Sequence, residues 1–261
     1  FVGGDLSSIG GFRSDWSSCL LSVRLSTGAL NQWNPAVVGA VKALAVIGRR
    51  LYVAGELQFV GAQDTLLTDR PFTRGLAAVD VSTAYRVWSI IMGESSAVET
   101  ILIVDSTMYF GGRFSSAGRQ RRGNVGAYNF VTGQMTPWNP TTNGPVYALV
   151  LSGTKMYLGG YFTFVGDAPR AKLAAVDLAA GALKTWNAYA NGTVYALTIF
   201  GGRLYAGGSF TSINSVKRDG IASLDTSTAL VADWNPSMGG GVSMLKTSGS
   251  TLYAGGSFTM V

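Results

Sequence analysis

Short apolar segments separated by glycine, serine, threonine and asparagine run through the whole chain. Residues 194–199 are β-branched and apolar, Gly201 and Gly202 follow, and a second apolar segment occupies residues 204–210. This pattern predicts two antiparallel strands joined by a tight turn. A third strand, a turn and a fourth strand are expected at residues 221–224, 225–229 and 230–234.

An aromatic residue followed by small residues, the second always glycine, recurs at a nearly constant interval. Tyr109, Tyr157, Tyr205 and Tyr253 begin the last four copies and lie 48 residues apart. A fixed period of this length indicates a repeat protein. We expect a single repeat domain over residues 1–261, with approximate repeats at 1–40, 41–96, 97–144, 145–192 and 193–240 and a partial copy at 241–261.

The predicted strands carry apolar residues on both alternating faces. A sheet buried on one side only would alternate apolar and polar positions, so these sheets are expected to pack on both sides. Four short strands in each unit, stacked face to face, are typical of a β-propeller. The sequence therefore predicts an all-β fold, a β-propeller of about five four-stranded blades, with a stacked β-solenoid of the same repeats as the alternative.

Two further positions recur in every repeat. The turn before the fourth strand ends in a small residue, at Gly28, Ala84, Gly133, Gly181 and Ala229, and glycine there suits a left-handed backbone. The fourth strand ends in a tryptophan, at Trp33, Trp88, Trp138, Trp186 and Trp234. We expect these tryptophans to pack between blades rather than to bind a ligand, and the small residues of the aromatic-glycine motif to let neighbouring sheets approach closely.

Three motifs resemble a known family. They are Tyr205-Ala-Gly-Gly-Ser-Phe-Thr211, Ile221-Ala-Ser-Leu-Asp225, and Trp-Asn-Pro before a valine-rich strand. The chain resembles the extracellular β-propeller repeats called delta-sixty repeats, a domain of unknown function. The resemblance covers the whole chain and is strongest in the last three repeats; residues 61–75 carry an insertion. It implies secretion or surface display within large adhesive or structural proteins, and it implies no catalytic residues. Kelch repeats share the period, but their usual spacing from the glycine pair to the tryptophan does not fit.

Composition narrows the function further. Charged residues make up 13% of the chain, about half the usual share, which favours a secreted surface that is glycosylated or packed against other copies; the alternative is a heavily buried fold. The net charge of +6 comes without a long basic run, so nucleic-acid binding is not expected. Histidine is absent and Cys19 is the only cysteine, which excludes His-dependent nucleophiles and an intrachain disulfide. We expect no cofactor, no metal and no membrane span, and an extracellular or cell-surface location.

The connection between the second and third strands is basic in every repeat. These basic connection residues are Arg13, Arg70, Arg74, Arg119, Arg121, Arg122, Arg170, Lys172, Lys217 and Arg218. In a propeller they would form a ring at one end, which could bind a polyanion such as an acidic glycan or a neighbouring subunit. The alternative, which we favour, is local pairing with the aspartate that ends the third strand, at Asp80, Asp177 and Asp225.

Two smaller candidates remain. Glu56, Glu94 and Glu99 lie in the irregular second repeat, but nothing in the sequence sets them in the convergent geometry of a glycosidase, and no enzyme is expected. Asn191 begins Asn-Gly-Thr, the only N-glycosylation sequon, and is the candidate glycosylation site.

Residues 1–9 and 253–261 are the same element of the repeat, so one strand is left over after five periods. Either the chain is a portion of a longer array, or the spare strand adds to the sheet of the next molecule and grows a filament. We therefore expect a non-enzymatic structural or scaffold unit of an extracellular assembly, with further copies or neighbouring repeats as partners. The alternative is an adhesion module that binds glycans or polyanions through the basic ring.

Overall fold

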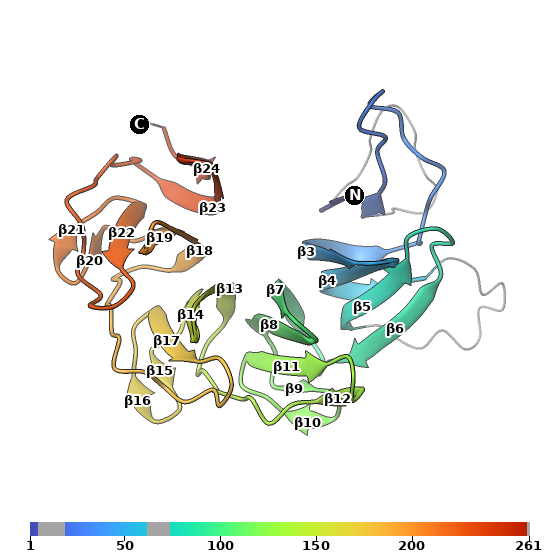
Figure 1. Cartoon of the computed structure of the whole chain (residues 1–261), viewed down its shortest axis with the longest axis horizontal. Helices are drawn as coiled ribbons and strands as arrows, with labels where there is room; N and C mark the ends of the chain where they lie inside the picture. Colours follow the sequence, from blue (N-terminus) through green and yellow to red (C-terminus); the bar gives the residue numbers. More distant parts are fainter. Residues whose placement is uncertain (5–18, 62–73, 260–261) are drawn as a thin grey trace. The chain divides into compact units, whose positions relative to one another are not determined.

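The computed structural model describes residues 1–4, 19–61 and 74–259 (Figure 1). These residues form 24 strands and no helix, and every strand pairing given for them is antiparallel. The prediction of an all-β fold is confirmed. The chain divides into two compact units, residues 1–108 with 112–122 and residues 109–111 with 123–261. None of the described residues forms a helix that could cross a membrane.

The first unit contains the fullest version of the repeat. Its four-stranded sheet has the order β3-β4-β5-β6, with bounds Val38–Ile47, Arg50–Phe59, Gly75–Asp80 and Arg86–Ile91. Its other strands are β1 (Val2–Gly3) paired with β2 (Leu20–Leu21), β7 (Ala97–Val104), and the short hairpin β9 (Ser116–Ala117) with β10 (Gln120–Arg121). Strand β8 (Thr107–Arg113) contributes residues to both units.

The second unit repeats a shorter sheet. Two three-stranded sheets have the order β13-β14-β17 and β18-β19-β22, with bounds Val146–Ser152, Lys155–Gly160, Leu173–Asp177, Val194–Phe200, Arg203–Gly208 and Ile221–Asp225. The unit also contains two antiparallel pairs, β11 (Val125–Asn129) with β12 (Gln134–Met135) and β23 (Gly241–Ser248) with β24 (Thr251–Ser257). The predicted first, second and third strands are thus confirmed in these repeats.

Neighbouring sheets of the second unit pack face to face. One core cluster joins Tyr157 and Leu173 of one repeat to Val194, Leu204 and Phe210 of the next, and all five are at most 1% exposed. The other face of the sheet β18-β19-β22 packs against Val242 and Leu245 of β23, so burial of both faces is confirmed for this sheet, as the continuous apolar strands predicted.

The predicted fourth strand is largely wrong. Only β6 is a full strand, β12 has two residues, and three repeats make a single bridge, such as Leu224 with Val231. In the fourth and fifth repeats the chain instead forms a short hairpin after the second strand, where the sequence analysis expected a basic connection without strands. These hairpins are β15 (Phe164–Val165) with β16 (Ala168–Pro169) and β20 (Ser212–Ile213) with β21 (Val216–Lys217).

A β-bulge in each long first strand explains why the second small residue of the motif is always glycine. The register of β18 on β19 shifts between Val194 and Ala196, and the same shift occurs in β3, β13 and β23. At the bulge, a Cβ on Gly208 would lie 2.0 Å from the carbonyl oxygen of Thr193. The first glycine behaves as predicted, because a Cβ on Gly207 would press on Val242 of the next repeat.

Candidate functional site

The tryptophans join consecutive repeats by hydrogen bonds as well as by packing. Trp138 Nε1 donates to the carbonyl oxygen of Asp177 at 3.0 Å, and Trp186 Nε1 donates to that of Asp225 at 3.0 Å. Both indoles are nearly buried, at 2% and 4% exposure. Trp33 donates in the same way to Asp80 within the first unit. The predicted structural role of these tryptophans is confirmed.

A tyrosine strengthens the junctions of Trp138 and Trp186, and the sequence analysis missed this role. The Tyr157 hydroxyl donates to the carbonyl oxygen of Thr226 at 2.6 Å, and its ring meets Trp186 edge-on, with centroids 5.0 Å apart. Burial and the nearby Asp225 raise the pKa of Tyr157 to about 12, so the hydroxyl remains a donor at neutral pH. The signal in the sequence was the fixed spacing of the motif tyrosine and the tryptophan. We call this tyrosine–tryptophan pair, with the two carbonyls it binds, the repeat latch.

The last repeat carries the donors of a repeat latch on an open surface. Trp234 is 39% exposed, although its ring meets Tyr205 in the same edge-on geometry, with centroids 5.3 Å apart. A pocket of about 360 Å³ lies against both side chains and is also lined by Thr247, Thr251 and Leu252. Among the residues that the structure describes, neither Trp234 Nε1 nor the Tyr205 hydroxyl has an acceptor.

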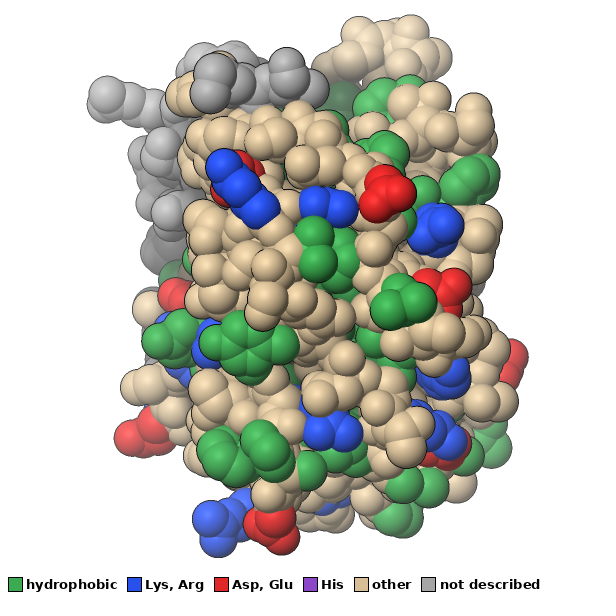
Figure 2. All heavy atoms as spheres, turned by 90° about the vertical axis from the view of Figure 1, so that its left-hand side faces the viewer, with side chains coloured by type: hydrophobic (Ala, Val, Ile, Leu, Met, Phe, Trp, Pro, Cys, Tyr) green, Lys and Arg blue, Asp and Glu red, His purple; other side chains and the backbone are tan. Residues whose placement is uncertain are grey.

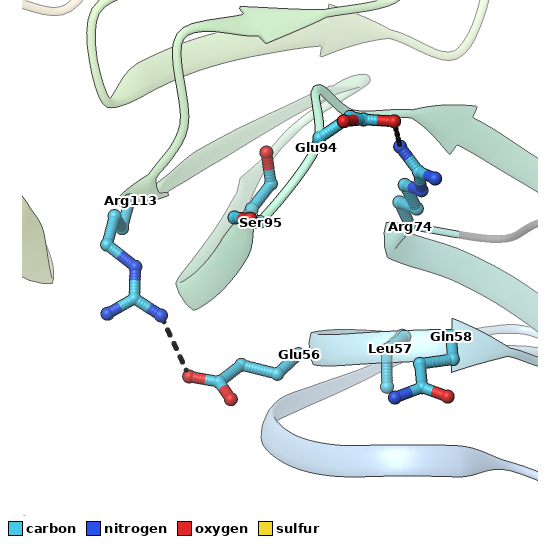
Figure 3. A pocket seen from close by; sticks show the side chains of 8 residues that line it. Glu56, Leu57, Gln58, Arg74, Glu94, Ser95 and Arg113 are labelled. Carbon is cyan, nitrogen blue, oxygen red and sulfur yellow. Dashed lines mark hydrogen bonds and ion pairs between the residues drawn. The ribbon is translucent and has the colours of Figure 1, made fainter.

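A polar pocket of about 590 Å³ lies in the first unit (Figure 3). Glu56 follows the glycine of its motif on β4, and Arg113 holds the same position in the next repeat. Their side chains meet at 3.1 Å, and Arg74 meets Glu94 at 3.2 Å on the other side of the pocket. Opposite charges at one position of successive repeats were the signal that could have revealed the first pair.

The pocket is electrically balanced, which limits its chemistry. Each carboxylate that lines it is turned toward an arginine (Figure 3). These pairs are solvent-exposed, and such pairs contribute only about 0–1 kcal/mol, so a polar ligand could replace them. Glycoside hydrolysis needs a carboxyl that stays protonated beside an ionised one. Burial raises the pKa of Glu99, and Glu56 raises it further, but Glu99 does not line this pocket.

The basic connection residues do not form a uniform ring of exposed charge. Arg13 and Arg70 lie outside the described residues. Of the other eight, Arg119, Arg121 and Lys217 are exposed, whereas Arg122 and Arg218 are buried; the remaining three are half-buried: Arg74, Arg170 and Lys172. On the face drawn in Figure 2, basic and acidic side chains are interspersed.

An arginine at the same position of the connection in two successive repeats braces the backbone. Arg218 donates to the carbonyl oxygens of Lys217 and Ala232, each at 2.6 Å. Arg170 donates in the same pattern to Pro169 at 2.8 Å and Lys184 at 3.2 Å. These arginines hold the segment that was expected to be a fourth strand. Lys172 lies over the Tyr161 ring, 4.5 Å from its centroid.

The ion pairs that the described residues form with the aspartates at the ends of the third strands involve other basic residues than those predicted. Asp177 pairs instead with Lys184 at 2.6 Å, and Asp80 pairs with Arg49 at 3.5 Å. The main role of these aspartates is to close the turn that follows, because Asp177 Oδ1 accepts from the backbone N–H groups of Ala179 and Ala180. The turn then needs a left-handed residue, and all five residues at this position have a φ of 63–71°, the alanines as well as the glycines: Gly28, Ala84, Gly133, Gly181 and Ala229.

Asn191 has a structural role within its repeat. Its Oδ1 accepts from the N–H groups of Thr211 and Ser212, and its Nδ2 donates to Thr211 Oγ1 at 2.7 Å. Asn143 makes the same three contacts one repeat earlier, outside any sequon. The side chain of Asn191 is exposed, so glycosylation remains a prediction that this structural role does not require.

Comparison with known proteins supports the fold and leaves the function open. No protein-family model matches the sequence, and no curated protein is significantly similar to it. A chain of the Mitotic Checkpoint Complex matches with a TM-score of 0.60 and 13% identity, over 89% of this chain and 62% of that chain. The computationally designed Ika8 protein matches with a TM-score of 0.52 and 14% identity, over 83% of this chain and 68% of the designed one. The chain thus spans less than two thirds of the checkpoint protein. At this identity the likeness shows only the fold, an all-β, β-propeller-like arrangement of repeated sheets.

Proposed function

We propose that this chain is a non-enzymatic structural unit of an extracellular or cell-surface assembly, built as a propeller of about five blades. The observation that carries the proposal is the repeat latch. Its acceptors are backbone carbonyls, such as those of Asp225 and Thr226, and not particular side chains. Any further repeat with the same turn could therefore be held in the same way, which is the basis of an extensible array.

Further observations on the proposed non-enzymatic role concern the catalytic and metal-ligating groups among the described residues. The Arg-paired carboxylates of the polar pocket are poorly suited to acid–base chemistry, and histidine is absent from the sequence. The part of the chain that the structure describes contains no group of three or more metal-ligating side chains. The low share of charge and the resemblance to delta-sixty repeats favour an extracellular or surface location.

Sedimentation velocity and negative-stain electron microscopy of the purified 261-residue chain test this proposal. We expect assemblies that grow with protein concentration and persist between about 0.1 and 1 M salt, because apolar burial and backbone hydrogen bonds are little screened. A strict monomer at every concentration would overturn the proposal. A monomer that also bound an acidic polysaccharide in low salt only would favour the adhesion module instead.

A further inference from the structure

One repeat of the second unit carries three side chains that the other repeats lack. Tyr161 follows the glycine pair of the motif, Lys172 directly precedes the third strand, and Tyr189 is the third residue after the tryptophan. The residues at these positions in other repeats include Glu56, Arg113, Ser209 and Ser257; Gly75, Asn124 and Gly220; and Ala36, Thr141 and Ser237. The packing shared by the repeats therefore does not require two tyrosines and a lysine here.

Lys172 occupies a strained backbone position. Its φ is 70°, close to the 84° of Gly75 and the 75° of Gly220 at the same position. Glycine adopts such a left-handed φ without steric cost, whereas a residue with a side chain is strained there. None of the ion pairs formed by the described residues includes Lys172, so no salt bridge offsets the strain. Backbone strain of this kind is concentrated at ligand-binding and active sites.

The three side chains gather on one surface. Lys172 Nζ lies 4.5 Å from the centroid of the Tyr161 ring. Lys172 and Tyr189 form an isolated antiparallel bridge, in which opposite residues carry their side chains on the same face. Tyr161 and Tyr189 are 59% and 55% exposed, and among the described residues neither phenol hydroxyl has a hydrogen-bond partner. We call these three side chains the tyrosine–lysine patch.

The backbone under the tyrosine–lysine patch is already hydrogen-bonded. The N–H group of Lys172 donates to Phe162, and its carbonyl oxygen accepts from Gly160. The N–H and carbonyl groups of Tyr189 are both bonded to Asn214. A peptide that adds as a strand needs free main-chain donors and acceptors, so a ligand here must be recognised by the side chains.

These side chains match the chemistry of an anionic sugar. A sugar ring has a C–H face that packs on an aromatic ring, and its hydroxyl groups can bond to the phenol hydroxyls of Tyr161 and Tyr189. The ammonium group of Lys172 supplies one positive charge, which attracts one negative group. We infer that the tyrosine–lysine patch binds an acidic saccharide, through a sugar residue that bears a carboxylate or a sulfate. This inference goes beyond the proposed function and does not depend on self-assembly.

Titration calorimetry of the 261-residue chain in about 0.15 M salt tests this inference. The probes are oligogalacturonate, its uncharged methyl ester, sulfated dextran and plain dextran. We expect at least one acidic probe to bind, and its uncharged counterpart to bind about tenfold more weakly or less, because a charge-assisted hydrogen bond is lost. Equal binding of the uncharged counterpart, or no binding of either acidic probe, would overturn the inference. So would equally tight binding of polyglutamate, which would assign the patch to acidic peptides.

The variant Lys172→Gly separates a binding role from a structural one. It removes the charge and relieves the strained backbone, so affinity should fall about tenfold or more while the thermal unfolding temperature stays the same or rises. Lys172→Arg keeps the charge and should retain most of the affinity. The control Lys217→Gln removes one exposed charge from the same unit and should leave binding unchanged. Equal losses in Lys172→Gly and Lys217→Gln would indicate diffuse attraction by basic residues and refute the inference.

The tyrosines provide a second, independent measurement. Tyr161→Ala and Tyr189→Ala should each weaken binding about fivefold, because each removes a ring that packs on the sugar. Tyr195→Ala, which removes a 38% exposed tyrosine outside the patch, is the matched control and should have no effect. Unchanged binding in both patch variants would refute the inference. A strict monomer that bound the acidic sugar would contradict only the proposed structural role, and an assembly that bound neither acidic probe would contradict only this inference.

Discussion

Two adjacent glycines of β19 should differ sharply in their tolerance of a methyl group. A Cβ on Gly208 would lie 2.0 Å from the carbonyl oxygen of Thr193, whereas a Cβ on Gly207 would lie 2.7 Å from Val242 Cγ1. The first neighbour is backbone, fixed by the pairing at the bulge. The second is a side-chain methyl group that can move, and the equivalent position in the second repeat is already Ala54.

The magnitudes follow from what must move. Relieving the contact at Gly208 requires a shift of about 1 Å in a paired strand, so Gly208→Ala should cost more than about 4 kcal/mol of the free energy of unfolding. Gly207→Ala overpacks a well-filled core and should cost about 1–3 kcal/mol. Gly208 does not have a positive φ, so the expected cost is steric and not conformational.

Urea unfolding followed by circular dichroism and tryptophan fluorescence measures both variants against the unchanged chain. The reasoning requires Gly208→Ala to have the lower midpoint, by a clear margin, with Gly207→Ala still cooperatively folded. Equal midpoints, or a milder effect at Gly208, would show that the bulge does not confine this backbone and would refute the explanation of the invariant glycine.

Four further substitutions probe the turns and the latch. Lys184 and two backbone N–H groups lower the pKa of Asp177 to about 2. The ionised Asp177 therefore stabilises the fold above the unfolded pKa of about 4, and this stabilisation is lost as the pH falls toward 2. Asp177→Asn should flatten the curve of stability against pH between those two values. Gly28→Ala meets no atom within 4 Å but keeps a φ of 71°, so thermal unfolding should report a loss of about 1 kcal/mol from backbone strain alone. Trp186→Phe removes one buried hydrogen bond and should cost about 1–2 kcal/mol in urea, whereas Trp234→Phe in the monomer should cost much less.

The acid-limb experiment has a built-in comparison. Asn129 takes the place of the aspartate in the third repeat and accepts from the N–H groups of Val131 and Thr132 as an aspartate would. An asparagine can therefore close the turn without a charge. A curve for Asp177→Asn as steep as that of the unchanged chain would mean that another carboxyl governs the acid limb.

Much of the fold could be predicted from the period of the repeat and from the apolar residues at alternating positions of the strands. Local sequence features that recur in each repeat predicted the first three strands, the left-handed turn residues and the packing of the tryptophans. The prediction of a fourth strand was wrong because residues far along the chain determine what this segment pairs with. In the last full repeat, Arg218 from the short hairpin takes the carbonyl of Ala232. Where Trp88 is followed by Ser89 instead of asparagine, the strand β6 continues past it.

The candidate sites were harder to predict for the same reason. A count of basic residues does not distinguish Arg121, which is exposed, from the buried Arg122 beside it. The pairing of Glu56 with Arg113 joins residues 57 positions apart, and only the stacking of two repeats brings them together. Which charged residues are exposed, and which of them pair, depends on how the repeats pack and cannot be predicted from the order of residues.

The sequence by itself determined that a four-part β unit recurs and must cover its apolar faces with its neighbours, because strand propensity, turn chemistry and period are all local. Only the tertiary structure decided which carbonyls the tryptophans and tyrosines bind and where the bulge demands glycine. Those facts depend on contacts between residues tens of positions apart, and such contacts exist only after the repeats have packed.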